Sequence, residues 1–155
     1  MQPIVGYNFR AQKHNRVQQT LRLGILSGVV ITSSGFLICE LFPHAVSALF
    51  TDSDELIDLA VEGLRLAVLM FPFVGAQIVI GNFFQSIGKA KISIFLSLTR
   101  QLLYLLPCLL LFPNWWGLKG IWISMPVSDA LAFITAVISL MIYIKKVSKQ
   151  QPIAE

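Results

Sequence analysis

Four long apolar runs divide this 155-residue chain, and they limit its possible folds more than any other feature. The runs cover approximately residues 21–42, 63–86, 92–112 and 120–144. Each has roughly 20 residues or more, which is enough for a helix to cross a hydrocarbon core about 30 Å thick. None of them alternates polar and apolar residues as the strands of a membrane barrel do. The sequence therefore predicts an all-α integral membrane protein with a four-helix transmembrane segment over residues 21–144.

The composition supports the same conclusion. Charged residues make up 13% of the chain and hydrophobic residues 55%, with a mean hydropathy of +0.73. A soluble domain carries roughly 25% charged residues, because its surface must be hydrated. A chain of this length also cannot surround four such helices with polar ones. The lipid bilayer is thus the first expected partner.

Strongly basic segments alternate along the chain with segments that carry one basic residue or none. Basic residues precede the first run, separate the second from the third and follow the fourth, whereas the loop after the first run carries only acids. The positive-inside rule then predicts that both termini are cytoplasmic, with residues 1–20 a basic amphipathic loop and residues 145–155 a tail. We expect a multi-pass protein of the cytoplasmic (inner) membrane. The net charge of +4 indicates attraction to anionic lipid rather than nucleic-acid binding.

No pattern typical of an enzyme site occurs in the sequence. It has no phosphate-binding loop, no nucleophile beside a base and no dinucleotide-binding glycine pattern. Cys39 and Cys108 lie within apolar runs, where packing is the simpler role. His14 and His44 have no second ligand at a metal-site spacing. We therefore predict neither an enzyme nor a protein with a metal or cofactor of its own.

Small and amide residues give two of the runs a distinct face. Gly24, Gly28 and Gly35 share one face of the first run, which favours close helix packing in lipid. In the second run, the polar stripe comprises Gln77, Gly81 and Gln85 at four-residue spacing, with Asn82 beside them. Amides in hydrocarbon need hydrogen-bond partners, so this stripe faces either other helices or a watery substrate pathway. Pro72 removes a backbone hydrogen bond in the same run and predicts a kink, with or without a role in transport.

A charged residue interrupts each of the last two runs. By the helical rise, Arg100 lies about 12 Å from the cytoplasmic end of its helix, and Asp129 about 14 Å from the outer end of the next. An unpaired charge near the membrane centre costs at least about 2.5–3.5 kcal/mol. We therefore predict that Arg100 and Asp129 pair across the two helices, either to hold the bundle together or to handle protons or substrate. Ser93, Ser97 and Tyr104 share the arc of Arg100.

Four motifs lie in order along the chain: QPIVGYN (residues 2–8) with a basic amphipathic stretch after it, FFQSIGKAK (83–91), SLTRQ (97–101) and GIWISMPVSD (120–129). Together they extend over nearly the whole chain. They resemble the C-terminal half of multidrug and toxic compound extrusion (MATE) transporters. The opening motif resembles the QPIxGYNxGA-type loop of that family.

This resemblance implies cation-coupled antiport of organic, often cationic, compounds, with H⁺ or Na⁺ as the coupling ion. Family members have about twelve helices in two lobes around a central cavity. This chain is then expected to supply the last four helices, a fragment whose partner is the missing N-terminal lobe. The candidates for lining a substrate cavity are Gln77, Asn82, Gln85 and Tyr104.

The sequence departs from the family pattern at two places. Arg10 stands where the family usually has glycine. Some members place a cation-binding carboxylate in the helix that corresponds to the second run, where this chain has Ala76 and Gln77. Coupling would then rely on a carboxylate in the missing lobe, or this branch couples differently.

Two other functions remain open from the residues. A lipid-linked oligosaccharide flippase of the same superfamily would need several cations to hold a pyrophosphate, and Arg65 and Arg100 alone are a thin supply. A standalone four-helix membrane scaffold or small exporter is the second alternative. Small exporters usually carry an acid in their first helix, for which Glu40, at the outer end, is a poor substitute.

Overall fold

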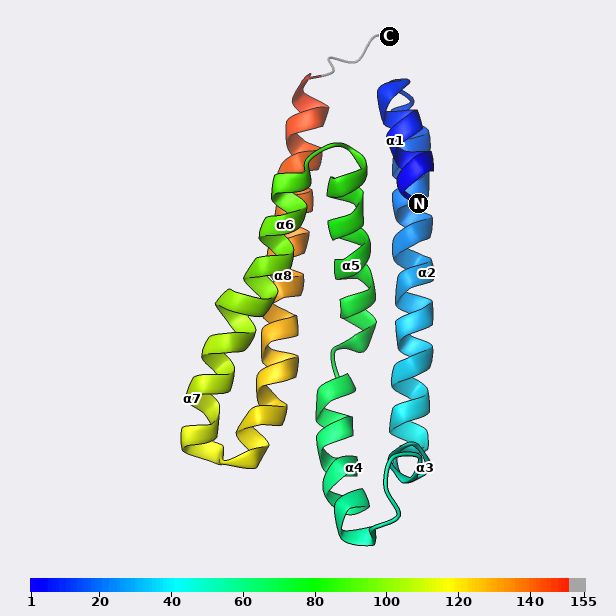
Figure 1. Ribbon diagram of the computed structural model, residues 1–155. Coiled ribbons are helices and arrows are strands. Elements are labelled where there is room, and N and C mark those ends of the chain that lie inside the picture. Colours follow the sequence, from blue (N-terminus) through cyan, green and yellow to red (C-terminus); the bar gives the residue numbers. More distant parts are fainter. Residues whose placement is uncertain (151–155) are drawn as a thin grey trace.

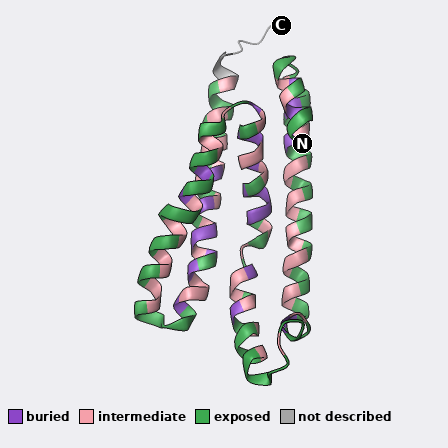
Figure 2. Cartoon of the chain, viewed as in Figure 1, coloured by how far each residue is buried: buried purple, intermediate pink, exposed green. Residues whose placement is uncertain are grey.

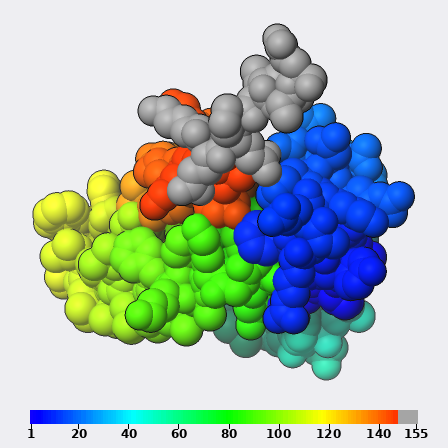
Figure 3. Space-filling view, turned by 90° about the horizontal axis from the view of Figure 1, so that it is seen from above, coloured from blue at the N-terminus to red at the C-terminus, as the bar shows by residue number. Residues whose placement is uncertain are grey.

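The computed structural model describes residues 1–150, with side chains described as far as Val147. Within these residues the chain is helical throughout and contains no strand. The elements are α1 (Gln2–Arg10), α2 (His14–Leu41), α3 (Pro43–Ala48), α4 (Asp54–Val68), α5 (Phe71–Ser86), α6 (Ala90–Leu98), the π-helix η1 (Thr99–Leu105), α7 (Leu106–Trp116) and α8 (Leu118–Gln150). Figure 1 shows them as a bundle of long antiparallel stretches, and the end-on view of Figure 3 places α2 and α7 on opposite sides.

Four stretches are long and apolar enough to cross a membrane. Three are continuous: α2, the run α6–η1–α7 (Ala90–Trp116) and α8 as far as Val147. The fourth is the pair α4 and α5, which pass the same test together but meet at an angle of 47°. The all-α prediction with four transmembrane helices is confirmed.

Proline explains the two irregular places within the spans. Pro72 lies in the first turn of α5, where its ring clashes with the carbonyl of Val68, so α4 ends there and the span bends. Pro107 lies at the corresponding place in α7 and cannot donate to Leu103. The turn before it widens into η1, a local π-helix of the kind often found at functional sites. The kink at Pro72 was expected from the sequence, whereas η1 was not.

Within the predicted basic amphipathic loop of residues 1–20, residues 2–10 and 14–20 are helical. Helix α1 runs antiparallel to the start of α2, and the two are joined by a tight turn in which Gln12 has a φ of 55°. Val5 on α1 is completely buried, and the backbone of Gly6 lies against the carbonyl of Ser86 at the end of α5. Burial of this apolar face stabilises the helix, because a short helix in water is otherwise marginal.

Glycine brings α2 and α5 into close contact. A side chain at Gly75 would come within 2.5 Å of the Gly28 carbonyl oxygen, and one at Gly24 would press on Val79. Two of the three glycines on the predicted face of α2 therefore face α5, whereas Gly35 has no neighbour within 4 Å. Backbone approach of this kind allows the van der Waals packing that holds helices together in lipid.

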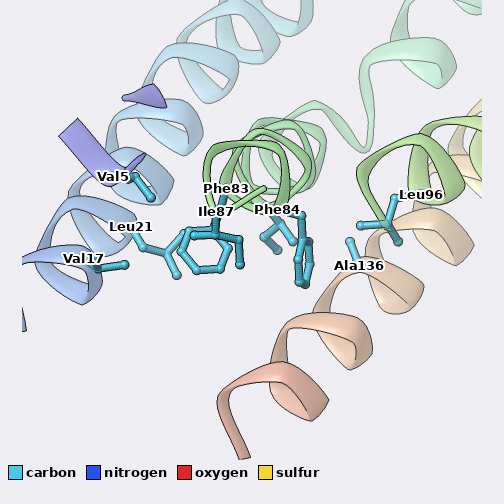
Figure 4. Packing of buried hydrophobic residues seen from close by; sticks show 9 residues of the cluster. Val5, Val17, Leu21, Phe83, Phe84, Ile87, Leu96 and Ala136 are labelled. Carbon is cyan, nitrogen blue, oxygen red and sulfur yellow. The ribbon is translucent and has the colours of Figure 1, made fainter. Parts of the chain in front are cut away.

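The apolar core lies at the end of the bundle where α1 meets α2. We call this cluster the basic-end core, after the Lys and Arg residues around it. Its buried members come from α1, α2, α5 with the residue after it, α6 and α8, and Figure 4 shows most of them: Val5, Val17, Leu21, Phe83, Phe84, Ile87, Leu96 and Ala136. Figure 2 shows that buried residues follow α5 and α8, while the outer faces of α2 and α7 are exposed. Large apolar side chains on those faces suit contact with lipid or another protein surface.

Candidate functional site

An ion pair lies in the middle of the bundle. Arg100 Nε on η1 is 2.8 Å from Asp129 Oδ1 on α8. The Asp129 side chain is only 8% exposed and that of Arg100 is 37% exposed. The contact neutralises the carboxylate, which would otherwise be an isolated charge in a medium of low dielectric constant. The two charges that the sequence placed near the membrane centre thus lie together.

A polar hollow of about 190 Å³ opens between α5 and α6 on one side of this pair. We call it the α5–α6 hollow. Its polar lining residues are Gln77, Asn82, Ser93, Ser97 and Arg100. Gly81 also lines it, and the absence of a side chain there leaves room in front of Ser93.

The polar groups of this hollow have unused hydrogen-bonding capacity. Gln77 Oε1 is buried and has no hydrogen-bond partner among the described residues. The side chains of Asn82, Ser93 and Ser97 likewise form no hydrogen bond with another described side chain or with the described backbone. Elsewhere in the bundle hydroxyls bond back to their own helix, as Ser124 does to the Gly120 carbonyl. Since an unmade bond costs about 1–3 kcal/mol for a buried group, this hollow suits a polar ligand or water.

A second hollow, of about 410 Å³, lies on the other side of the pair. We call it the α4–α8 hollow. Arg100, Gln101, Ser128 and Asp129 are its polar lining residues, and Phe71, at the bend between α4 and α5, forms part of its wall. Gln101 was missed from the sequence. It follows Arg100 directly in η1, and the structure places both side chains at this hollow.

The four predicted cavity residues do not all lie together. Gln77 and Asn82 line the α5–α6 hollow. Tyr104 lines neither hollow, and its hydroxyl is 2.8 Å from the Thr135 hydroxyl on α8. Gln85 lies at the basic end of α5, where it is exposed and accepts a hydrogen bond of 3.0 Å from Gln2 on α1.

No metal site is apparent among the described residues. Within residues 1–147, no three His, Cys, Asp or Glu side chains come together as a metal ion would require. The chemistry available at the centre is hydrogen bonding and charge pairing.

Comparison with known proteins places this arrangement among transporters. A family model described as MatE matches residues 1–110. A solved chain called only "protein A" is 37% identical, with a TM-score of 0.84; the match covers 90% of this chain and 31% of that one. An inward-facing and an outward-facing structure of a multidrug resistance MATE family transporter of the MOP superfamily have TM-scores of 0.90 and 0.88. These two are 19% and 20% identical to this chain, of which 97% and 96% are covered.

The matched part is a minor share of each solved transporter. The aligned region is 36% of the inward-facing chain and 34% of the outward-facing chain. This chain therefore spans about a third of the length of these transporters. Comparison with curated proteins gave no match.

Proposed function

Because the chain belongs to the MatE family of membrane transporters, we propose that it forms the last four helices of a cation-coupled multidrug antiporter. The transporter would export organic, often cationic, compounds in exchange for H⁺ or Na⁺. The rest of the cavity would come from an N-terminal lobe, since this chain corresponds to about a third of the solved transporters. We place it in the cytoplasmic membrane with both termini of the described bundle on the cytoplasmic side, from its basic residues.

The observation that carries this proposal is the unpartnered amide oxygen of Gln77. A buried acceptor without a partner destabilises the fold, so a role in packing gives no reason for it. It lies in a hollow with Asn82, two serines and one end of an ion pair. Such a site can accept a hydrogen bond from an N–H or O–H group of a transported compound and give others in return.

The mechanism we propose is alternating access, with this bundle moving as a unit. Solved transporters described as inward-facing and outward-facing both contain this arrangement of helices, with similar TM-scores. Glycine contacts between α2 and α5 and the Arg100–Asp129 pair favour a rigid bundle. Rocking of the two lobes would then expose the polar hollows to each side of the membrane in turn.

A flippase is less well supported by the charges in the spans. Arg65 Nε lies 3.6 Å from Glu40 Oε1, and Arg100 is paired with Asp129. Arg65 and Arg100, the two arginines within the second and third apolar runs, therefore both lie beside carboxylates. A pyrophosphate would have to compete with those carboxylates for each cation.

Efflux from a pump-deficient bacterial host tests the proposal. The chain is expressed alone, and also together with the first eight helices of a solved MATE transporter supplied as a separate chain. We expect ethidium accumulation to fall only when both chains are present. Efflux by this chain alone would overturn the proposal, since one third of a transporter would then be sufficient.

A matched pair of variants connects the efflux to the hollow. Gln77→Leu removes the unpartnered acceptor, and Gln85→Leu makes the same change on the same helix outside the hollow. We expect Gln77→Leu to reduce efflux by the paired chains at least about tenfold, the equivalent of one hydrogen bond to substrate. Gln85→Leu should leave most of the efflux. Equal efflux by the two variants would exclude the α5–α6 hollow from the pathway.

A further inference from the structure

An apolar groove of about 220 Å³ lies between α2 and α8 at the basic end of the bundle, well away from the polar centre. We call it the α2–α8 groove. Helices α2 and α8 each pack on α5 rather than closely on each other, which leaves the space between them. Leu21 on α2, Phe83 on α5 and Tyr143 and Ile144 on α8 line this space with apolar surface.

The rim of the groove is cationic. Lys89 Nζ lies 4.3 Å from the centre of the Tyr143 ring, so a positive charge is held directly at one wall. His14 lines the groove and also belongs to an adjoining hollow of about 420 Å³, which Lys13 and Arg16 line as well. An apolar space and a basic space therefore meet at His14.

The cations at this end lack carboxylate partners in the described structure. Of the ion pairs among residues 1–147, none includes Lys13, Arg16 or Lys89. The acidic residues of the described chain lie elsewhere: Asp129 at the centre, and Glu40, Asp52, Asp54, Glu55, Asp58 and Glu62 on the outer half. Within residues 1–147, the basic end thus presents positive charge without a carboxylate partner beside an apolar groove.

We propose that the α2–α8 groove binds an anionic phospholipid, with an acyl chain against Leu21, Phe83 and Tyr143 and the phosphate at Lys13, Arg16 and Lys89. Each part of the site accounts for one part of the ligand. Burial of methylene groups against apolar side chains favours binding of the acyl chain. Several cations close together at the membrane surface favour binding of the anionic headgroup. A free phosphate has no chain for the groove, and a zwitterionic lipid lacks the net charge that the rim attracts.

Native mass spectrometry of the full chain in detergent tests this proposal. Phosphatidylglycerol is titrated. Phosphatidylcholine, which has acyl chains but no net charge, and inorganic phosphate, which has charge but no acyl chain, are the controls. We expect one phosphatidylglycerol to bind at least about tenfold more tightly than phosphatidylcholine, with no saturable binding of phosphate. Equal binding of the two lipids would overturn the proposal, as would phosphate that displaces the lipid at millimolar concentration.

Two double variants with the same charge change separate a site from general surface charge. Lys13→Gln with Arg16→Gln removes one lysine and one arginine from the rim, and Lys91→Gln with Arg22→Gln removes the same pair from exposed positions that do not line the groove. If each removed cation lowers the affinity for phosphatidylglycerol about fivefold, the rim variant should bind this lipid about 25-fold more weakly. The control should retain wild-type affinity. Equal loss in both would overturn the proposal.

A groove-filling variant tests the apolar half. Ile144→Trp places a larger side chain in the groove at a partly exposed position and leaves every charge in place. We expect it to abolish phosphatidylglycerol binding, with Ile138→Trp, on the exposed face of the same helix, as the control. Circular dichroism confirms folding, and Val147→Trp replaces the first variant if it does not fold. Lipid binding that occurs only after deletion of residues 151–155 would overturn the proposal. None of these outcomes depends on transport.

Discussion

The basic-end core and the polar centre of the same bundle differ in how far their buried side chains have suitable partners. In the core, Val5 and Phe84 are fully covered by apolar neighbours, and the rings of Phe83, Phe84 and Tyr143 pack at 5.7–5.9 Å. At the centre, Gln77 is also buried, yet its amide oxygen has no partner in the described structure. The core holds its members by apolar contacts, although Leu21, Phe83 and Tyr143 also line the α2–α8 groove. The centre, by contrast, has polar groups that are free to bind something else.

This difference in partners allows residues that stabilise the fold to be distinguished from residues that bind a ligand. Apolar contacts need no partner beyond van der Waals packing, so truncation of a well-packed core side chain weakens the fold. A buried polar group without a hydrogen bond costs stability, so its removal can strengthen the fold. Substitutions in the two regions should therefore change the free energy of unfolding in different directions.

The largest effect is expected in the basic-end core. Phe84→Ala should lower the free energy of unfolding by about 3 kcal/mol, because it leaves a cavity beneath Phe83 and Tyr143. Reversible denaturation in detergent micelles provides the measurement. Leu103→Ala, at a side chain that is 61% exposed, is the control and should change the value by less than about 0.5 kcal/mol. Similar losses in both would mean that the core is not the stable part of the bundle.

The next effect is expected at the ion pair. Asp129→Asn leaves the guanidinium of Arg100 without its carboxylate and should cost about 2 kcal/mol, reduced from the value for a fully buried pair because Arg100 is 37% exposed. The same denaturation experiment measures it.

The double variant Arg100→Gln with Asp129→Asn is the informative control for that prediction. It removes both charges together, so we expect it to recover more than half of the lost free energy. If the double variant were as unstable as Asp129→Asn, the lost free energy of unfolding would come from missing hydrogen bonds or altered packing. It would not come from an unpaired charge.

Much of this architecture could be predicted from the sequence, for reasons that particular residues make plain. The four spans follow from run length, and Pro72 indicated the bend between α4 and α5. Arg100 and Asp129 were placed at similar depth by the helical rise alone, and the structure contains a contact between them. The MatE resemblance, which came from short motifs, agrees with the matched family.

The remaining features depend on tertiary contacts that periodicity does not describe. Helix α1 is stabilised by the end of α5, far away in sequence, so its residues alone indicated a loop. Gln85 shares a helix face with Gln77, yet it lies about 12 Å further along, beyond the hollow. Gln101 and Tyr104 both lie in η1, which the sequence did not indicate. The structure places Gln101 at the α4–α8 hollow and Tyr104 against Thr135.

A smaller effect of opposite sign is expected at Gln77. Gln77→Leu removes the unpartnered acceptor and should raise the free energy of unfolding by about 1 kcal/mol in detergent, where no transported compound is present. Gln85→Leu breaks the exposed hydrogen bond with Gln2 and should lower it slightly. A stabilised protein with reduced efflux would be the signature of a binding residue. A destabilised Gln77→Leu would instead assign this amide to the packing of the bundle and remove the contrast with the core.

The smallest effect is expected at Tyr104, which lies near the centre but lines neither hollow. Tyr104→Phe removes one hydrogen bond, while Thr135 keeps its bond to the Leu131 carbonyl at 2.9 Å, so the free energy of unfolding should fall by only about 0.5–1 kcal/mol. A double-mutant cycle with Thr135→Val should assign most of this loss to the contact between the two hydroxyls. In paired chains the variant should export ethidium as the wild type does. If Tyr104→Phe reduced efflux as much as Gln77→Leu, the functional region would extend across η1 to α8, and the polar centre would be larger than its two hollows.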